Sequence, residues 1–265
     1  MRRQLQCAVV LAISGCAKAP QLEGEVLDVF GDPIEQANVQ LENAAEFIET
    51  DSSGRFVVVL EEGTSSATTL KVAAGKLGYI EQLRTIDMPQ EADGAMPTVT
   101  FSLYPDPEST GLFAVGDQSY IQVPSLPIKL MNDELQAYAG IEDQRLSSAQ
   151  AVVDARRGFV FRTEATQSQL ARLKLRLHKL EYKQQTKATG LEGEVDVDIE
   201  MWLAQSDVPF DLTVLAPEGH YLISTRETLD SGTYAFHTQE MLSASAHDLI
   251  GVPVGLRVAY VFQVN

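Results

Sequence analysis

The sequence contains almost no cysteine and little positive charge. Its two cysteines, Cys7 and Cys16, both lie close to the N-terminus of the 265-residue chain. No disulfide can therefore cross-link the body of the protein, which must be stabilised by an apolar core, and no thiolate is left there to bind zinc. The chain has 20 basic and 37 acidic residues and a net charge of −17, which disfavours binding to nucleic acid.

Recognisable catalytic motifs are absent too. The histidines, at positions 178, 220, 237 and 247, show neither the His-Glu-x-x-His nor the His-x-His spacing of zinc sites. There is no Gly-x-Ser-x-Gly elbow, no Ser-x-x-Lys pair and no Gly-rich phosphate loop. We therefore predict no catalytic residue, no metal ligand and no cofactor, and a protein that is not an enzyme. A hydrolase in the C-terminal domain is an alternative.

The first sixteen residues have the layout of a bacterial export signal. A basic start, Met1-Arg2-Arg3, precedes an apolar run at 6–13 that is too short to span a bilayer. The run ends in Ile13-Ser14-Gly15-Cys16. This sequence resembles the lipobox of bacterial lipoproteins, in which an aliphatic residue and two small residues precede a cysteine. The resemblance implies cleavage after Gly15 and lipidation of Cys16; an ordinary secretory signal is the alternative.

Lipidation would make the membrane a partner of this protein. Residues 1–15 would be the signal peptide and 16–21 a lipidated tether, because several acyl chains at one site give a stable anchor. Position 17 is Ala and not Asp, which resembles the sorting pattern for the outer membrane in an organism with two membranes. In any other organism the anchor would lie in the cell membrane.

The next stretch, 22–104, has the pattern of an all-β domain. Seven short strands are predicted because apolar residues alternate with polar ones between turn sequences, at about Val26, 37–41, 45–50, 56–60, 70–74, 79–86 and 98–103. Such a succession is typical of a β-sandwich. The Val-rich strand 56–60 is expected to be buried on both faces. Asp28, Asp32 and Asp51 are interpreted as turn caps, with a calcium site as the alternative.

Several spaced elements of this domain suggest a family. They are Gly24-x-Val26, Gly31-x-Pro33-Ile34, Ala37-x-Val39, Thr50-Asp51-x-x-Gly54-x-Phe56 and Gly78-Tyr79. Together they resemble the carboxypeptidase regulatory-like domain. The resemblance implies a transthyretin-like sandwich of seven strands that serves as a non-catalytic accessory module on peptidases, transporters and surface proteins.

A Pro-punctuated segment, 105–110, is interpreted as a linker to a second domain at 111–265. This domain is predicted to be β-rich, with a hairpin of 111–115 and 120–123, later strands that include 232–237 and a C-terminal strand at 256–264, and one or two short helices. The helices are expected at about 147–157, where alanine is frequent and Gly158 is the expected stop, and at about 239–249. We recognise no family for this domain.

Two stretches of the second domain carry opposite charges in alternation with apolar residues. Arg172, Lys174, Arg176 and His178 alternate with leucines, and four acids alternate with apolar residues over 194–201. We predict that the two stretches are antiparallel strands joined by a loop at 183–193, with the charges side by side. A helix over 170–180 and a cation site on the acidic stretch are the alternatives.

These observations predict a lipid-anchored protein of the cell envelope that acts as a non-catalytic binding or structural module. An accessory subunit of an envelope secretion or peptidase assembly is the main alternative, in which an exposed strand edge docks an envelope protein as the partner. The only tryptophan, Trp202, is predicted to lie in the core.

Overall fold

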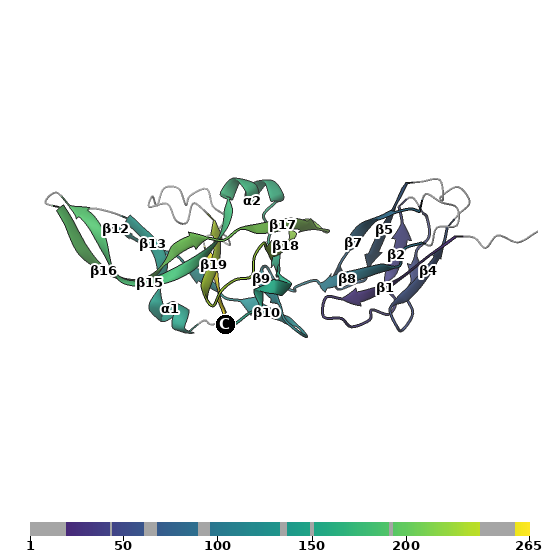
Figure 1. Cartoon of the computed structure of the whole chain (residues 1–265), viewed down its shortest axis with the longest axis horizontal. Helices are drawn as coiled ribbons and strands as arrows, with labels where there is room; N and C mark the ends of the chain where they lie inside the picture. Colours follow the sequence, from purple (N-terminus) through teal and green to yellow (C-terminus); the bar gives the residue numbers. More distant parts are fainter. Residues whose placement is uncertain are drawn as a thin grey trace, which may run out of the picture.

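A computed structural model of the chain consists mainly of β-strands, arranged in two bodies that follow each other along the long axis (Figure 1). The structure describes residues 20–42, 44–60, 68–89, 96–132, 137–148, 151–190, 193–238 and 258–265. The lipobox, the lipidation site Cys16 and the predicted helix at 239–249 lie outside the described residues.

The N-terminal body is a β-sandwich, as the sequence predicted. Its strands are β1 (Gln21–Asp28), β2 (Asn38–Leu41), β3 (Ile48–Glu49), β4 (Arg55–Val59), β5 (Thr69–Gly75), β6 (Tyr79–Ile80), β7 (Gln82–Asp87) and β8 (Val99–Pro105). They form two four-stranded sheets with the orders β4-β1-β8-β6 and β3-β2-β5-β7. The single strand expected at 79–86 is two short strands, one in each sheet.

The core of the sandwich follows the alternation of the sequence. Val26, Phe101 and Val72 are fully buried between the two sheets. The prediction that strand 56–60 is buried on both faces was wrong. Val57 and Val59 are 46% and 57% exposed, because they lie on the outer face of the sandwich. Phe56, Val58 and Leu60 on the other face contact the core.

Two aspartates of this domain cap turns, as predicted. The Oδ1 atom of Asp28 accepts hydrogen bonds from the backbone N–H groups of Phe30 and Asp32 at 2.8 and 2.9 Å. Asp51 accepts in the same way from Ser53 and Arg55. Within the described ranges no three His, Cys, Asp or Glu residues are placed to hold a metal ion.

The C-terminal body contains two further sheets. Its elements are β9 (Gly111–Val115), β10 (Tyr120–Val123), β11 (Ser125–Pro127), β12 (Lys129–Asn132), β13 (Ala137–Glu142), α1 (Asp143–Ser148), the 3-10 helix η2 (Ala155–Arg157), β14 (Phe159–Arg162), α2 (Gln167–Leu173), β15 (Leu175–Gly190), β16 (Gly193–Asp207), β17 (Phe210–Leu215), β18 (His220–Thr225), β19 (Gly232–Thr238) and β20 (Val258–Val264). The orders are β10-β9-β14-β18-β17 and β11-β20-β19-β15-β16-β13-β12.

Aromatic side chains fill the space between these two sheets. Phe159 on β14 lies 5.3 Å from Phe236 and 5.0 Å from Phe262, measured between ring centroids, and all three are fully buried. Edge-to-face and tilted ring pairs of this kind add to the free energy gained by burial. Strand β20, which supplies Phe262, lies between β11 and β19, so the predicted C-terminal strand is confirmed.

The helix predicted at 147–157 was wrong. Helix α1 spans Asp143–Ser148, residues 151–153 are extended alongside β20, and only Ala155–Arg157 is helical, as a 3-10 turn. The expected stop at Gly158 is correct, since its φ of +79° ends the turn. The alanines that suggested a helix, Ala151 and Ala155, are small residues buried in the core.

The prediction that the two charged stretches pair with each other was wrong, although the strands that contain parts of them, β15 and β16, are neighbours. The acidic stretch at 194–201 lies opposite 183–189 and not opposite the basic stretch at 172–178. β15 and β16 are antiparallel, with His178 opposite Asp207 and Lys187 opposite Asp196. The segment 183–193 is therefore mostly strand. Helix α2, which starts at a capping box of Thr166 and Gln169, takes up the first part of the basic stretch through Leu173. Alternation of charge with period two fits any register shifted by two residues, so it cannot select one.

The linker joins the two bodies through specific contacts. Buried His220 contacts the Oδ1 atom of Asp106 with its Nε2 at 2.9 Å, and Arg162 reaches the same carboxylate at 3.3 Å. The Tyr120 hydroxyl donates to the Pro105 carbonyl, and its ring packs edge-on against Phe30 of the sandwich. The segment predicted as a linker is thus held against the second domain.

Candidate binding cleft

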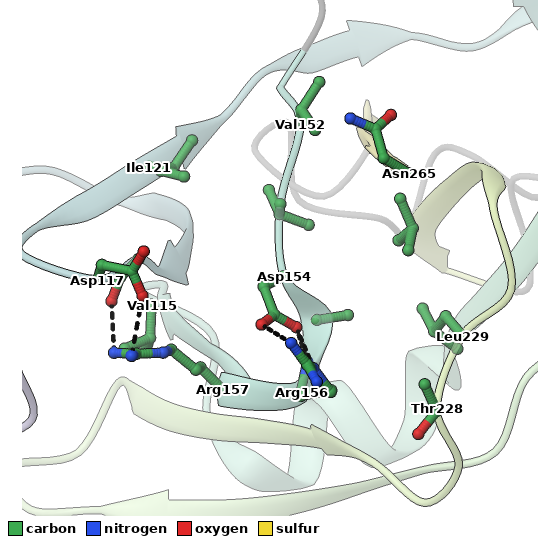
Figure 2. A pocket seen from close by; sticks show the side chains of 14 residues that line it. Val115, Asp117, Ile121, Val152, Asp154, Arg156, Arg157, Thr228, Leu229 and Asn265 are labelled. Carbon is green, nitrogen blue, oxygen red and sulfur yellow. Dashed lines mark hydrogen bonds and ion pairs between the residues drawn. The ribbon is translucent and has the colours of Figure 1, made fainter.

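A cleft of about 520 Å³ opens between the two sheets of the C-terminal domain (Figure 2). It is lined by residues from four parts of the chain, namely 115–121, 152–157, 228–229 and 264–265. Apolar side chains and charged pairs both contribute to its surface. Two other hollows, beside Phe210 and beside Trp202, are smaller, at about 340 and 20 Å³.

One wall is the hairpin of β9 and β10. The hairpin closes with the Gly116 N–H donating to the Ser119 carbonyl at 3.0 Å, and β10 forms the edge of its sheet. Ile121 lies on the same face of β10 as Val123, which is buried in the core. Ile121 itself is 36% exposed, so it presents an apolar surface to the cleft.

The opposite wall is the extended segment 151–153. It runs parallel to the end of β20, because the Val153 N–H donates to the Gln263 carbonyl and the Gln263 N–H donates to the Ala151 carbonyl, at 2.9 and 2.8 Å. The side chain of Val153 is buried in the core, whereas Val152 is 46% exposed. Figure 2 shows Ile121 and Val152 on separate segments that border the cleft.

An Asp154–Arg156 pair, largely exposed to solvent, also lines the cleft. The Arg156 guanidinium donates two hydrogen bonds to the two carboxylate oxygens of Asp154, at 2.8 and 2.7 Å. The backbone N–H of Arg156 also donates to this carboxylate, which caps η2. These donors lower the pKa of Asp154 to about 2, so the carboxylate is ionised at any physiological pH.

A second pair fixes the hairpin to η2. Arg157 donates to the Gly116 carbonyl at 3.0 Å and contacts the Asp117 carboxylate at 2.9 Å. Gly158 follows with a positive φ, and a Cβ atom there would lie 2.8 Å from the Ile223 carbonyl. The two arginines are thus oriented by two carboxylates, and the charges of the cleft balance. The arrangement provides fixed polar groups beside apolar walls, which suits binding.

A second cluster brings together two histidines that are far apart in sequence. His178 Nδ1 and His237 Nε2 are 2.8 Å apart with nearly parallel rings, and His178 Nε2 is 3.3 Å from Asp207. His237 Nδ1 faces the Thr238 carbonyl at 2.9 Å, and since a carbonyl only accepts, this nitrogen carries the proton. His178 must then donate from Nδ1 to His237.

Burial sets the ionisation of these histidines. It lowers the pKa of His237 to about 4, and it also lowers the pKa of His178, where Asp207 opposes the shift. With both rings neutral, the hydrogen bonds run from the His178 ring through the His237 ring to a backbone carbonyl on β19. They link β15 to β19 and end on the backbone and not on a nucleophile.

The remaining residues singled out in the sequence have separate places. Trp202 is partly buried, and its Nε1–H donates to Asp143 at 2.8 Å, while its ring packs on a small cluster that includes Leu180. His220 belongs to the joint between the domains. His247 lies outside the described residues. Neither α1 nor α2 is long and apolar enough to cross a membrane.

Sequence reasoning did not find the cleft. Its residues come from segments separated by tens of positions, and none of them forms a motif. The available signal was indirect: Asp154-Ala155-Arg156-Arg157-Gly158 combines a cap residue, two cations and a stop glycine, which is turn chemistry that fixes side chains.

Comparison with known proteins gives little further information. No family model matches the chain, and no curated protein is significantly similar to it. Among solved structures, one from Bacteroides uniformis, described as a "putative carbohydrate binding protein", is similar over 83% of this chain and 88% of that one. The identity is 10% and the TM-score 0.24, values too low to relate the fold or the ligand of the two proteins.

Proposed function

We propose that this protein is a lipid-anchored, non-catalytic binding module of the bacterial cell envelope, with its ligand held in the cleft between Ile121 and Val152. The anchor is the lipid on Cys16, in the outer membrane where the organism has two membranes. The N-terminal sandwich, which resembles a carboxypeptidase regulatory-like domain, serves as the accessory module between anchor and binding domain.

The cleft is the observation that carries the binding role. Exposed large apolar side chains are costly in water, and here two of them border one cleft next to ion pairs with fixed geometry. The layout agrees with a role at a membrane surface. Strand β1 begins at Gln21, a few residues after Cys16, and the sandwich separates that end from the second domain (Figure 1).

A docking role as an accessory subunit is the second candidate, and one observation favours it. Strand β4 is a sheet edge that exposes Val57 and Val59. Uncovered edges with apolar side chains can pair with a strand of another protein. In that case a charge placed there, as in Val59→Lys, would release the partner, while the cleft variants described next would not.

The anchor can be tested by membrane fractionation. The Cys16→Ala variant should move from the membrane fraction to the soluble fraction, because the thiol that would take the lipid is gone. Cys7→Ala is the matched control and should stay in the membrane fraction. If Cys16→Ala remains in the membrane fraction, the lipid anchor is refuted.

The binding role can be tested with arrays that display peptides, envelope polysaccharides and phospholipids. The detergent-solubilised full chain should bind at least one class, and Ile121→Asp should weaken that binding by about tenfold, since a charge then replaces an apolar contact. Val214→Asp, an exposed valine on β17, is the matched control. Binding that is insensitive to Ile121→Asp would refute the cleft as the site.

A further inference from the structure

The backbone around the cleft indicates which class of ligand it takes. We infer that the cleft binds an extended peptide segment, apolar and net basic, which adds as a strand alongside residues 151–153. This inference rests on the proposed function and specifies its ligand.

The first argument is the hydrogen bonding of segment 151–153. In a parallel pairing, the residue between two bonded positions directs its own N–H and C=O to the opposite side. The Val153 N–H and the Ala151 C=O are bonded to Gln263, so the N–H and C=O of Val152 point away from β20. Among the described residues neither group has a partner, which leaves one donor and one acceptor for a new strand.

The second argument is the edge of β10. Gly116 and Ser119 are a hydrogen-bonded pair, and antiparallel pairs alternate. Ile121, opposite Ala114, therefore bonds to β9, whereas Tyr120 and Gln122 direct their backbone groups away from β9. Both walls of the cleft are consequently strand edges. The backbone N–H and C=O groups of an extended peptide can form hydrogen bonds with such edges. A small apolar ligand has no groups that form these bonds.

The third argument is charge. Asp154 is paired with Arg156 and Asp117 with Arg157, so the excess of negative charge comes from the whole protein, whose net charge is −17. The side chain of Asp117 is 90% exposed at the rim, where a ligand can still reach it. A peptide with acidic residues would be repelled on approach, and a basic residue could contact Asp117. Apolar residues at alternate positions would contact Ile121 and Val152, because side chains on one face of a strand recur every second residue.

The experiment begins with a phage-displayed library of random peptides selected on the full chain. Enriched peptides should carry alternating apolar residues and a net positive charge. Affinity is then measured for one enriched peptide. The Val152→Pro variant lacks the N–H that the fold itself does not use, so binding should fall by about tenfold. Val152→Thr keeps the N–H and should bind within about twofold of the wild type.

A modified peptide gives the same test without any protein variant. N-methylation removes one amide donor at a time, and only alternate positions of a paired strand point to the edge. One alternate set should lose about tenfold in affinity and the other should not. Equal tolerance of N-methylation at every position, or wild-type affinity of a folded Val152→Pro variant, would overturn the inference.

Binding to the arrays distinguishes a failure of the peptide inference from a failure of the proposed binding role. Polysaccharide or lipid binding that is sensitive to Ile121→Asp, with no peptide binding, leaves the binding role standing and refutes the peptide. Absence of any binding that depends on Ile121 refutes both.

Discussion

Acid should destabilise the C-terminal domain through His237. This side chain is 3% exposed, and burial lowers its pKa from 6.5 to about 4. The folded state therefore binds the proton less readily than the unfolded state. The neutral His237 ring contributes its full stabilisation above pH 6.5. This contribution is lost as the pH falls towards 4, and the loss levels off below pH 4.

The size of the loss follows from the shift in pKa. Each pKa unit corresponds to about 1.4 kcal/mol, so between pH 7 and pH 4.5 the wild type should lose about 2–3 kcal/mol through this group. The groups nearest to the ring are His178, Asp207 and Arg176. Asp207 favours the protonated ring and Arg176 opposes it, and their contributions are smaller than that of burial.

The assay is urea unfolding at both pH values, followed by the fluorescence of Trp202. This tryptophan lies on β16 in the same seven-stranded sheet as His237, so it reports on the correct domain. The His237→Gln variant cannot gain the proton, and its loss between the two pH values should be smaller by about 2–3 kcal/mol. Loss of equal size in both proteins, or an NMR titration of His237 with a pKa near 6.5, would refute the reasoning.

Two further predictions concern the packing of the sandwich and the joint between the two domains. Gly24→Ala should lower the free energy of unfolding of the sandwich by at least about 1 kcal/mol, because the added Cβ would lie 2.2 Å from the Val99 carbonyl and 2.4 Å from the Phe56 ring. Thermal denaturation measures this loss, and an unchanged midpoint would contradict the prediction. Asp106→Ala should cost about 1–3 kcal/mol, since the Nε2 atom of buried His220 loses its partner, and small-angle scattering should then show a wider range of interdomain distances. A scattering profile identical to that of the wild type would show that the joint does not depend on this carboxylate.

The sequence predicted the strands well because burial of one sheet face forces alternation with period two. The strand predicted at 70–74 is an example: in β5 buried residues such as Leu70 and Val72 alternate with more exposed ones. The helix at 147–157 was misplaced because alanine frequency does not distinguish a helix from a closely packed extended segment. Ala151 and Ala155 are such cases, and only the core around them decides.

Contacts between distant segments could not be predicted from the alternation of residues in the sequence. The register of β15 on β16 depends on two irregularities, near Lys179 and between Lys183 and Gln185, which local patterns do not encode. Ile121 and Val152 are ordinary hydrophobic residues in the sequence, and only the sheet edges turn them into the walls of a cleft. His178 and His237 are in contact because β15 and β19 are neighbouring strands. The separation of the two histidines in the sequence does not predict this pairing.

The joint at Asp106 has a geometric consequence for the binding domain. With His220 and Arg162 in contact with one carboxylate, and Tyr120 packed on Phe30, the sandwich of an anchored protein would act as a spacer of nearly constant length. A cleft carried on such a spacer would stay at one height above an anchoring membrane. It would encounter ligands that project to that height far more often than ligands of equal affinity that lie on the membrane surface.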